Sequence, residues 1–557
     1  MSGFESTRRQ ALALSLGSLA GLALPGWARA ADLGETDIDA IVLPFMKAYE
    51  TPGIAVAVVR PGLPAFVKGY GVRTLGKPAP VDAHTRFGIA SHSKAFTAAA
   101  LALLVDAGKL GWENPVLKHL PEFRMHDAAV TQMMTVRDLL VHRSGLPLGA
   151  GDLMYFPQSS HVAADVLKAL PYLKPVRGFR TGYDYDNILY LVAGVLIERV
   201  SGMGWDRFVE ERILAPLGMT DAVASRGALR TDNVAGRHAR LGPPVRGIGK
   251  LEVVQPDEGP AIDAAGGINA SVADMAKWLQ VQLDQGKLPN GKRLWSPEQA
   301  QEMWTPATIT SASGGPTPDN PARPILQAYA LGWFVQDYRG MRMIQHSGGL
   351  TGQVTYSALL PSRGIAVSVF SNVEESVSAA IRNAILDRLI DAPSFDWVAS
   401  YGARSRAAQQ EALASVAGGI DKAPAGGPSL PLAAYAGRYR DPWYGDIVIT
   451  EKGGKLTIDF TPTPVFKGAL EPWGGRYLPH PVRQGCGRGR HRHLRAEWRQ
   501  GDRGDDEGAL TARRFQLRLP ASLVRANSLI VQNARRSADV QDAGNVGFAV
   551  PTSHPAL

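Results

Sequence analysis

Cysteine is nearly absent from this chain of 557 residues, which has only Cys486. One cysteine forms neither a disulfide nor a thiolate metal site within a single chain. The histidines at His119, His126 and His142 show no paired spacing of the kind that metal ligands have. The sequence therefore predicts a protein that works without a metal ion and without any other cofactor.

Long apolar stretches are also scarce. The stretch 11–24 is short and interrupted by glycines, so it is poorly suited to span a membrane. Two arginines, Arg8 and Arg9, precede it, and Ala28-Arg29-Ala30 follows it, which is the pattern of a cleaved twin-arginine export signal. We expect residues 1–30 to be removed, leaving a periplasmic or secreted protein with no stable membrane span.

Lysine is missing from the C-terminal end of the chain. Residues 475–557 hold 14 arginines, no lysine and 7 acidic residues, so this segment carries +7 of the net charge of +9. A basic run such as 488–493 is one form of nucleic-acid arm, but no aromatic platform accompanies it, and we expect no nucleic-acid partner. An arginine- and glycine-rich sequence of this kind is typical of a GC-rich gene that is translated in a shifted reading frame. We predict a frameshift within 473–476, which resequencing would test, and a disordered tail.

The length of the chain predicts two folded domains, because one hydrophobic core rarely serves so many residues. A linker rich in glycine, alanine and proline follows a helix-like segment, and strand-like segments separated by Gly-Gly and Asp-Pro turns come after it. The predicted divisions after the signal are a large domain over 31–395, helix and linker over 396–428, the start of a β domain over 429–475, and the basic tail over 476–557.

A serine and a lysine, Ser91 and Lys94, lie three residues apart where a long apolar helix is expected to begin. Residues at this spacing share one helix face, so the two side chains would touch. The helix N-terminus favours negative charge on Ser91, and apolar neighbours lower the pKa of Lys94. The pattern indicates a nucleophile beside its own base. The alternative is a chance spacing, with Lys94 reaching out to solvent.

A tyrosine and an asparagine, Tyr185 and Asn187, stand directly before the apolar run 188–197. On a loop before a buried helix, a phenol and a carboxamide at this spacing would face a cleft together. Tyr185 could relay protons and Asn187 could hold a substrate amide. The alternative is that Asn187 only caps the following helix.

A third motif lies within the glycine-rich segment 344–352, which contains His346, Ser347, Gly348 and Gly349. We expect this segment and 364–372 to form β-strands, the second one buried. An edge strand beside a cleft would offer its N–H groups to an acyl oxygen. The alternative for His346 is an ordinary hydrogen-bonded histidine in a glycine-rich turn.

Together, these motifs resemble those of the serine β-lactamase and penicillin-binding-protein-like family, nearest to its class C and esterase branch. The resemblance implies an α/β (α+β) fold, with a sheet flanked by helices, a mostly helical lobe, and the site between them. The β segment after residue 429 resembles the small β-barrel module often attached to such hydrolases. The resemblance covers about 37–389 and includes 51–58, 86–90, 139–147, 265–271, 274–279 and 330–333.

Carried over by motif, the resemblance also implies a role for each residue. Ser91 would be the acylated nucleophile, Lys94 and Tyr185 the proton-transfer pair, and Asn187 a substrate contact. The N–H groups of Ser91 and Gly349 would form the oxyanion hole. The opposite wall would be lined by His346, Ser347 and Gly348.

One position departs from the family's pattern. Members adapted to β-lactams usually carry lysine where this chain has His346, and a histidine of ordinary pKa is mostly neutral at pH 7. We therefore expect a serine hydrolase acting on a small ester, amide or D-amino-acid-containing peptide. A β-lactamase or DD-peptidase is the alternative, and a non-catalytic penicillin-binding-like sensor is the second. An α/β-hydrolase is disfavoured, because the core has no Gly-x-Ser-x-Gly elbow.

Overall fold

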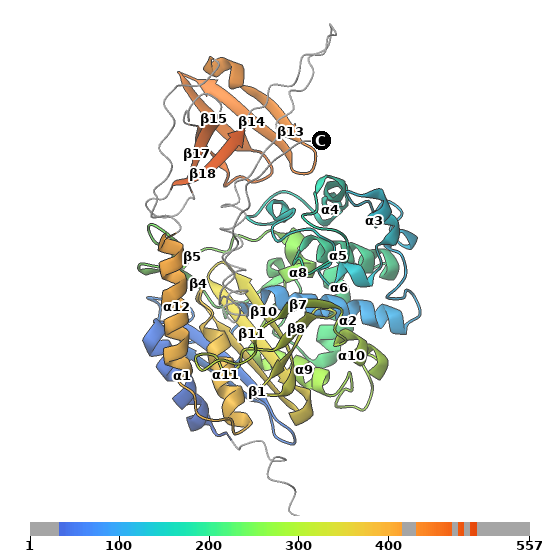
Figure 1. Ribbon diagram of the computed structural model, residues 1–557, viewed down its shortest axis with the longest axis vertical. Helices are drawn as coiled ribbons and strands as arrows, with labels where there is room; N and C mark the ends of the chain where they lie inside the picture. The colour runs from blue at the N-terminus through green and yellow to red at the C-terminus, as the bar shows by residue number, and fades with distance from the viewer. Residues whose placement is uncertain (1–32, 415–430, 471–476, 484–490, 498–557) are drawn as a thin grey trace, which may run out of the picture.

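The computed structural model describes residues 33–414, 431–470, 477–483 and 491–497 (Figure 1). Its centre is an eight-stranded antiparallel sheet in which the N-terminal strands pair with strands from the end of the large domain. The strands in spatial order are β2 (Phe66–Gly71), β1 (Gly53–Val59), β12 (Ile365–Ser371), β11 (Gln353–Leu360), β10 (Met341–Leu350), β9 (Phe334–Tyr338), β8 (Leu326–Tyr329) and β7 (Thr308–Ala312).

Both faces of this sheet are buried, and strand β1 shows why its sequence is continuously apolar. Successive side chains of a strand point to opposite faces. Ala55, Ala57 and Val59 belong to one hydrophobic cluster, and Ile54, Val56 and Val58 belong to another. The second cluster packs against the helices on one side of the sheet (Figure 1). These helices are α1 (Glu35–Tyr49), α11 (Val377–Leu389) and α12 (Trp397–Ala414).

The other face packs against α2 (Ser93–Asp106) and α9 (Val272–Leu283), where Phe96 stacks on Trp278 with ring centroids 3.9 Å apart. Helix α2 is buried nearly all round, as its alanine-rich sequence allows, and it lies between the sheet and the helical lobe. Its first turn therefore lies where sheet and lobe meet. The lobe contains α3 (Ala128–Met133), α4 (Ala163–Ala169), α5 (Ile188–Ser201), α6 (Trp205–Val209), α7 (Ala215–Leu217), α8 (Asp263–Gly266) and α10 (Pro297–Met303).

A separate four-stranded antiparallel sheet follows, with a small core of its own (Figure 1). Leu153 of the large domain belongs to this core, and the Ser160 N–H donates to the Pro462 carbonyl at 2.8 Å. The sheet therefore packs directly on the segment around 153–160. Its strands are β13 (Gly437–Asp441), β14 (Gly445–Lys452), β15 (Lys455–Phe460) and β16 (Lys467–Leu470).

Strand pairing continues beyond the boundary that the sequence predicted at residue 475. Strand β17 (Tyr477–Arg483) pairs with β18 (His491–Glu497) in an antiparallel hairpin. The expectation of disorder directly after residue 475 is therefore wrong for these two strands. The predicted signal, the linker after residue 414, Cys486, the frameshift site at 473–476 and the tail from 498 lie outside the described residues.

No single helix among the described residues is long and apolar enough to cross a bilayer. One bent pair, Ile188–Ser201 with Trp205–Leu217, passes on length and composition when the two are taken together, with an angle of 74° between them.

Candidate active site

Ser91 lies in a tight turn (Ala90–His92) immediately before α2. Ala90 has φ of +49°, a left-handed conformation that is uncommon for a residue with a side chain. The Ile89 N–H donates to the Ile268 carbonyl at 2.9 Å, which ties the turn to the segment after α8. Ser91 itself is partly exposed at the front of a buried helix, so its hydroxyl is accessible to a substrate.

Lys94 is fully buried, and its amine has three polar neighbours. Nζ lies 3.0 Å from Ser91 Oγ, 2.8 Å from Asn187 Oδ1 and 2.9 Å from the Ala265 carbonyl oxygen. The amide and carbonyl oxygens can only accept hydrogen bonds, so they hold two N–H groups of the amine. A neutral Lys94 therefore turns its lone pair toward the Ser91 hydroxyl, as a general base requires.

The charge state of Lys94 agrees with this geometry. Burial lowers its pKa to about 7, although the carboxylates of Asp152 and Asp186 act in the opposite direction. An amine with this pKa is largely neutral in the physiological range, whereas an ordinary lysine is not. Lys94 can therefore take up the Ser91 proton near neutral pH.

Tyr185 also contacts the nucleophile. Its hydroxyl donates to Ser91 Oγ at 2.9 Å, and Lys94 Nζ lies 4.9 Å from the centre of its ring. The imidazole of His142 packs against the same ring at a centroid distance of 4.2 Å. The phenol is thus held in place by packing, and it can pass a proton to or from the reacting oxygen.

Asn187 precedes the first residue of α5, but its side chain makes no capping hydrogen bond to that helix. Its Oδ1 instead accepts from Lys94. The structure therefore gives this residue a place in the site and not the role of a simple helix cap. Four of the predicted residues, Ser91, Lys94, Tyr185 and Asn187, form one hydrogen-bonded group.

Strand β10 forms the opposite wall. It is an inner strand of the sheet, but β9 pairs with it only as far as Gln345, so residues 346–350 have β11 on one side alone. A Cβ atom at Gly348 would lie 2.1 Å from the Ile89 carbonyl oxygen, so only glycine allows this close approach to the Ser91 turn. Ser347 and Gly349 are partly exposed, and they alternate with buried neighbours.

The His346 side chain is only 1% exposed, so it does not face a substrate directly. Its Nδ1 lies 2.6 Å from the Ser347 carbonyl oxygen, which only accepts, and its Nε2 lies 2.9 Å from the Tyr329 hydroxyl. This arrangement fits the neutral imidazole with the proton on Nδ1. Burial and the neighbouring His92 and Lys94 hold its pKa well below the usual value. The site therefore has no cation at this position.

The structure adds a carboxylate that sequence reasoning missed. Asp152 accepts hydrogen bonds from Tyr155 and from the side-chain amide of Asn187. Because the Asn187 oxygen faces Lys94, the Asp152 contact fixes which way the amide points. Burial raises the pKa of Asp152 to about 6. The one signal in the sequence is an acidic residue directly before the apolar stretch 153–156.

A second buried carboxylate belongs to Asp186, between Tyr185 and Asn187. Its oxygens accept from the Leu189 N–H at 3.0 Å and from the Ser144 hydroxyl at 3.1 Å. Burial raises its pKa to about 7. Asp186 thus fixes the start of α5, and it places a second acidic group near Lys94.

The pH dependence of the reaction follows from these contacts. Only neutral Lys94 accepts a proton, so we expect kcat/KM to rise with pH and to level off above about pH 7, near the pKa of Lys94. The negative charge of Asp152 stabilises the Lys94 ammonium, so Asp152→Asn lowers the pKa of Lys94 and moves this rise to lower pH. A pH profile of kcat/KM for both proteins measures the shift. Asp232→Asn, an exposed control, keeps the wild-type profile, and an unmoved profile in Asp152→Asn contradicts the coupling.

The site residues described above predict an activity that does not depend on a metal ion. Within the part of the chain that the structure describes, no group of three or more histidine, cysteine, aspartate or glutamate side chains could hold a metal ion. We expect activity to survive dialysis against EDTA unchanged, because Lys94 supplies the base that a metal-bound hydroxide would otherwise provide. Loss of activity that zinc restores would contradict this expectation.

A serine with a buried lysine and a tyrosine in contact with it, between an antiparallel sheet and a helical lobe, defines a serine hydrolase of the β-lactamase/transpeptidase-like fold. The chain belongs to the β-lactamase family: the family described as "Beta-lactamase" matches residues 38–392. A second family, described as a domain of unknown function (DUF3471), matches residues 421–505. That match covers the small β sheet and extends past residue 475.

Two relatives illustrate the family. The chain is similar to an unguisins hydrolase from Aspergillus campestris, with 31% identity over 434 residues, which cover 74% of this chain and 77% of that protein. It is also similar to the protein flp from Staphylococcus aureus, with 24% identity over 371 residues, which cover 66% of this chain and 68% of that one.

Three solved structures show the same fold. The penicillin-binding protein homologue from Pyrococcus abyssi, described as octameric, aligns with a TM-score of 0.55 and 22% identity over 84% of this chain and 97% of that one. A class C β-lactamase mutant aligns with a TM-score of 0.53 and 20% identity over 65% and 100%. A D-amino acid amidase from Ochrobactrum anthropi aligns with a TM-score of 0.52 and 22% identity over 64% and 98%.

Proposed function

We propose that this enzyme hydrolyses small amides or esters through a covalent acyl-enzyme on Ser91. The observation that carries the proposal is the position of Ser91 Oγ, 3.0 Å from the Lys94 amine and 2.9 Å from the Tyr185 hydroxyl. A serine hydroxyl is a weak nucleophile until a nearby base accepts its proton. Lys94, with its lowered pKa, supplies that base.

The reaction has two halves. In the first, Ser91 Oγ attacks the substrate carbonyl while Lys94 takes the hydroxyl proton, and the departing amine or alcohol receives a proton through Tyr185 or Lys94. In the second, water attacks the acyl-enzyme, the same groups take its proton, and Ser91 leaves with a proton as the acid is released. The backbone N–H groups of Ser91 and Gly349 are the proposed donors to the oxyanion.

For the substrate, we propose a small ester, amide or D-amino-acid-containing peptide. The family relationship to an unguisins hydrolase supports hydrolysis, and the fold shared with a D-amino acid amidase suggests which amides to test first. β-Lactams are less favoured substrates, because buried, neutral His346 offers no positive charge to their carboxylate.

A side-by-side assay tests this choice. Purified protein is given p-nitrophenyl esters, D- and L-aminoacyl amides and nitrocefin, with Ser91→Ala as the blank for each. The proposal expects turnover of an ester or a D-aminoacyl amide well above that of nitrocefin. Nitrocefin as the best substrate would assign a β-lactamase, and covalent labelling by penicillin without turnover of any substrate would assign a sensor.

We also propose that the protein is exported as a folded chain. The support is the pair Arg8-Arg9 before a weakly apolar run, followed by the cleavage pattern at 28–30. Fractionation of cells that express the wild type and an Arg8→Lys/Arg9→Lys variant tests this. Mature protein outside the cytoplasm in the wild type alone supports export, and equal distribution of the two proteins contradicts it.

A further inference from the structure

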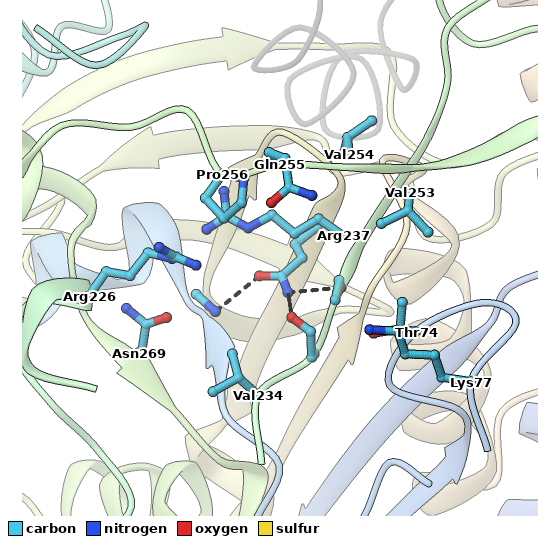
Figure 2. A pocket seen from close by; sticks show the side chains of 14 residues that line it. Thr74, Lys77, Arg226, Val234, Arg237, Val253, Val254, Gln255, Pro256 and Asn269 are labelled. Atoms are coloured by element: carbon cyan, nitrogen blue, oxygen red, sulfur yellow. Dashed lines mark hydrogen bonds between the residues drawn. The ribbon is translucent and has the colours of Figure 1, made fainter. Parts of the chain in front are cut away.

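A hollow lined in part by Gly88 lies close to the turn that carries the nucleophile, and Figure 2 shows it from close by. Its volume is about 260 Å³. The short strand β3 (Phe87–Gly88) contributes Gly88, and the hairpin of β4 (Arg237–Arg240) and β5 (Leu251–Val254) forms another wall. Ser91, Lys94, Tyr185 and Asn187 are not among the described residues that line it, so it is distinct from the catalytic group.

The charges around this hollow do not balance. Arg237 is 3% exposed and forms a two-pronged pair with Glu258, at 2.6 and 2.5 Å. Arg226 points to the same place but lies 3.9 Å from Glu258, too far for a hydrogen bond (Figure 2). Lys77 adds a third cation at the rim. Glu258 and its neighbour Asp257 both interact with Arg237, so three cations share two carboxylates in this part of the described structure.

Partial burial raises the electrostatic free energy of this excess positive charge. Arg226 is 44% exposed, and burial together with the charge of Arg237 lowers its pKa from the usual value. A bound anion would offset the electrostatic repulsion of a guanidinium that faces a second guanidinium in a half-buried site. Carboxylates and phosphates offer pairs of oxygens that match the donor geometry of arginine, and they form its strongest hydrogen bonds.

The Gln353 side chain, which lines the hollow, is held in place by hydrogen bonds to the backbone. The Gln353 amide accepts from the Gly88 N–H at 3.0 Å and donates to the carbonyls of Ala235 and Gly236 at 3.0 and 3.3 Å. A Cβ atom at Gly88 would lie 2.7 Å from a methyl of Leu350, so the absence of a side chain there allows the close packing. A ligand would therefore meet a preformed surface that needs little rearrangement.

We propose that this hollow is a binding site for a small oxyanion, a carboxylate or a phosphate, held by Arg226 with Lys77 at the rim. Val234, Val253, Val254 and Pro256 line the same space, so an organic anion with a short apolar body fits it. The volume is below the roughly 300–1,000 Å³ typical of sites for drug-sized ligands, so the ligand is small. The proposal does not depend on the substrate of Ser91.

Isothermal titration calorimetry tests the site with sodium butanoate and sodium phosphate as separate probes in a low-chloride buffer. The protein is Ser91→Ala, so that turnover contributes no heat. We expect binding that weakens about tenfold when Arg226→Gln is added, the loss typical of one charge-assisted hydrogen bond. Adding Arg230→Gln, an exposed arginine on the same segment, leaves the affinity unchanged.

Each outcome of the titration decides a separate point. Tighter binding of butanoate assigns the site to carboxylates, and tighter binding of phosphate assigns it to phosphate groups. No binding of either probe at millimolar concentration overturns the proposal, as does equal binding by the protein with Arg226→Gln. Binding to wild-type protein that a covalent Ser91 label blocks would place the anion in the catalytic cleft and would also overturn it.

Discussion

Replacing Ser91 with alanine is expected to lower kcat by about 10⁴-fold or more, because no other group can form the acyl-enzyme. Residue 91 is partly exposed, and within the described residues its hydroxyl contacts only the Tyr185 hydroxyl and the Lys94 amine. The variant should therefore fold normally. Initial rates on the best substrate, together with thermal unfolding, measure the two effects separately.

The neighbouring serine provides a matched control. The Ser93 hydroxyl is buried, and it accepts from the Ile268 N–H at 3.1 Å, so Ser93→Ala leaves that donor without its partner. We expect Ser93→Ala to lose about 1–3 kcal/mol of unfolding free energy while keeping covalent labelling by a fluorophosphonate. Wild-type turnover in Ser91→Ala would contradict the assignment of the nucleophile.

Replacing Lys94 with methionine is expected to lower kcat by about 10²–10⁴-fold, the range typical of a lost general base. Methionine fills similar space but cannot accept a proton. It also leaves the Asn187 Oδ1 and Ala265 carbonyl acceptors without their donor, so Lys94→Met should unfold at a lower temperature than Ser91→Ala. Single-turnover acylation rates measure the chemical effect apart from stability.

Lys94→Arg separates basicity from positive charge. A guanidinium keeps its proton at any ordinary pH, so this variant retains a cation but has no base. We expect it to be as inactive as Lys94→Met. An active Lys94→Arg enzyme would show that the position needs only a positive charge, and Lys94 would then not be the base.

The contacts among Ser91, Lys94, Tyr185 and Asn187 were predictable in part from the sequence, because two of the spacings are local. The catalytic roles of these residues stay a prediction. A spacing of three residues brings Ser91 and Lys94 together where α2 begins, and a spacing of two residues keeps Tyr185 and Asn187 together just before α5. That the two pairs meet was known only from the family resemblance. No periodicity in the sequence specifies a contact such as the one between Lys94 and Asn187, which lie 93 residues apart.

Other features depended on tertiary packing and were not predictable. His346 was expected on the wall of the cleft, but the Tyr329 hydroxyl and burial turn it into a neutral internal group. Asp152 joins the site only because its segment folds back onto Asn187. The sequence suggested an edge strand here, but it did not specify that only residues 346–350 of β10 lack a partner on the β9 side.

The boundary of the small β domain shows a different limit. The alternation of apolar and polar residues that marks β13 to β16 ends after residue 470, shortly before the arginine-rich segment begins. The β17–β18 hairpin and the family match to residue 505 both extend beyond that point. The predicted boundary at residue 475 rested on composition alone. The proposed frameshift within 473–476 remains a prediction that resequencing tests.

The central claim is that Ser91 becomes acylated because neutral Lys94 takes its proton. Mass spectrometry of intact and digested protein, quenched at set times after mixing with an activated p-nitrophenyl ester at several pH values, tests it most directly. We expect one acyl group on the peptide that contains Ser91, formed at a rate that rises up to about pH 7 and then levels off. An acyl group on another residue, or a rate on Ser91 that does not change with pH, would contradict it.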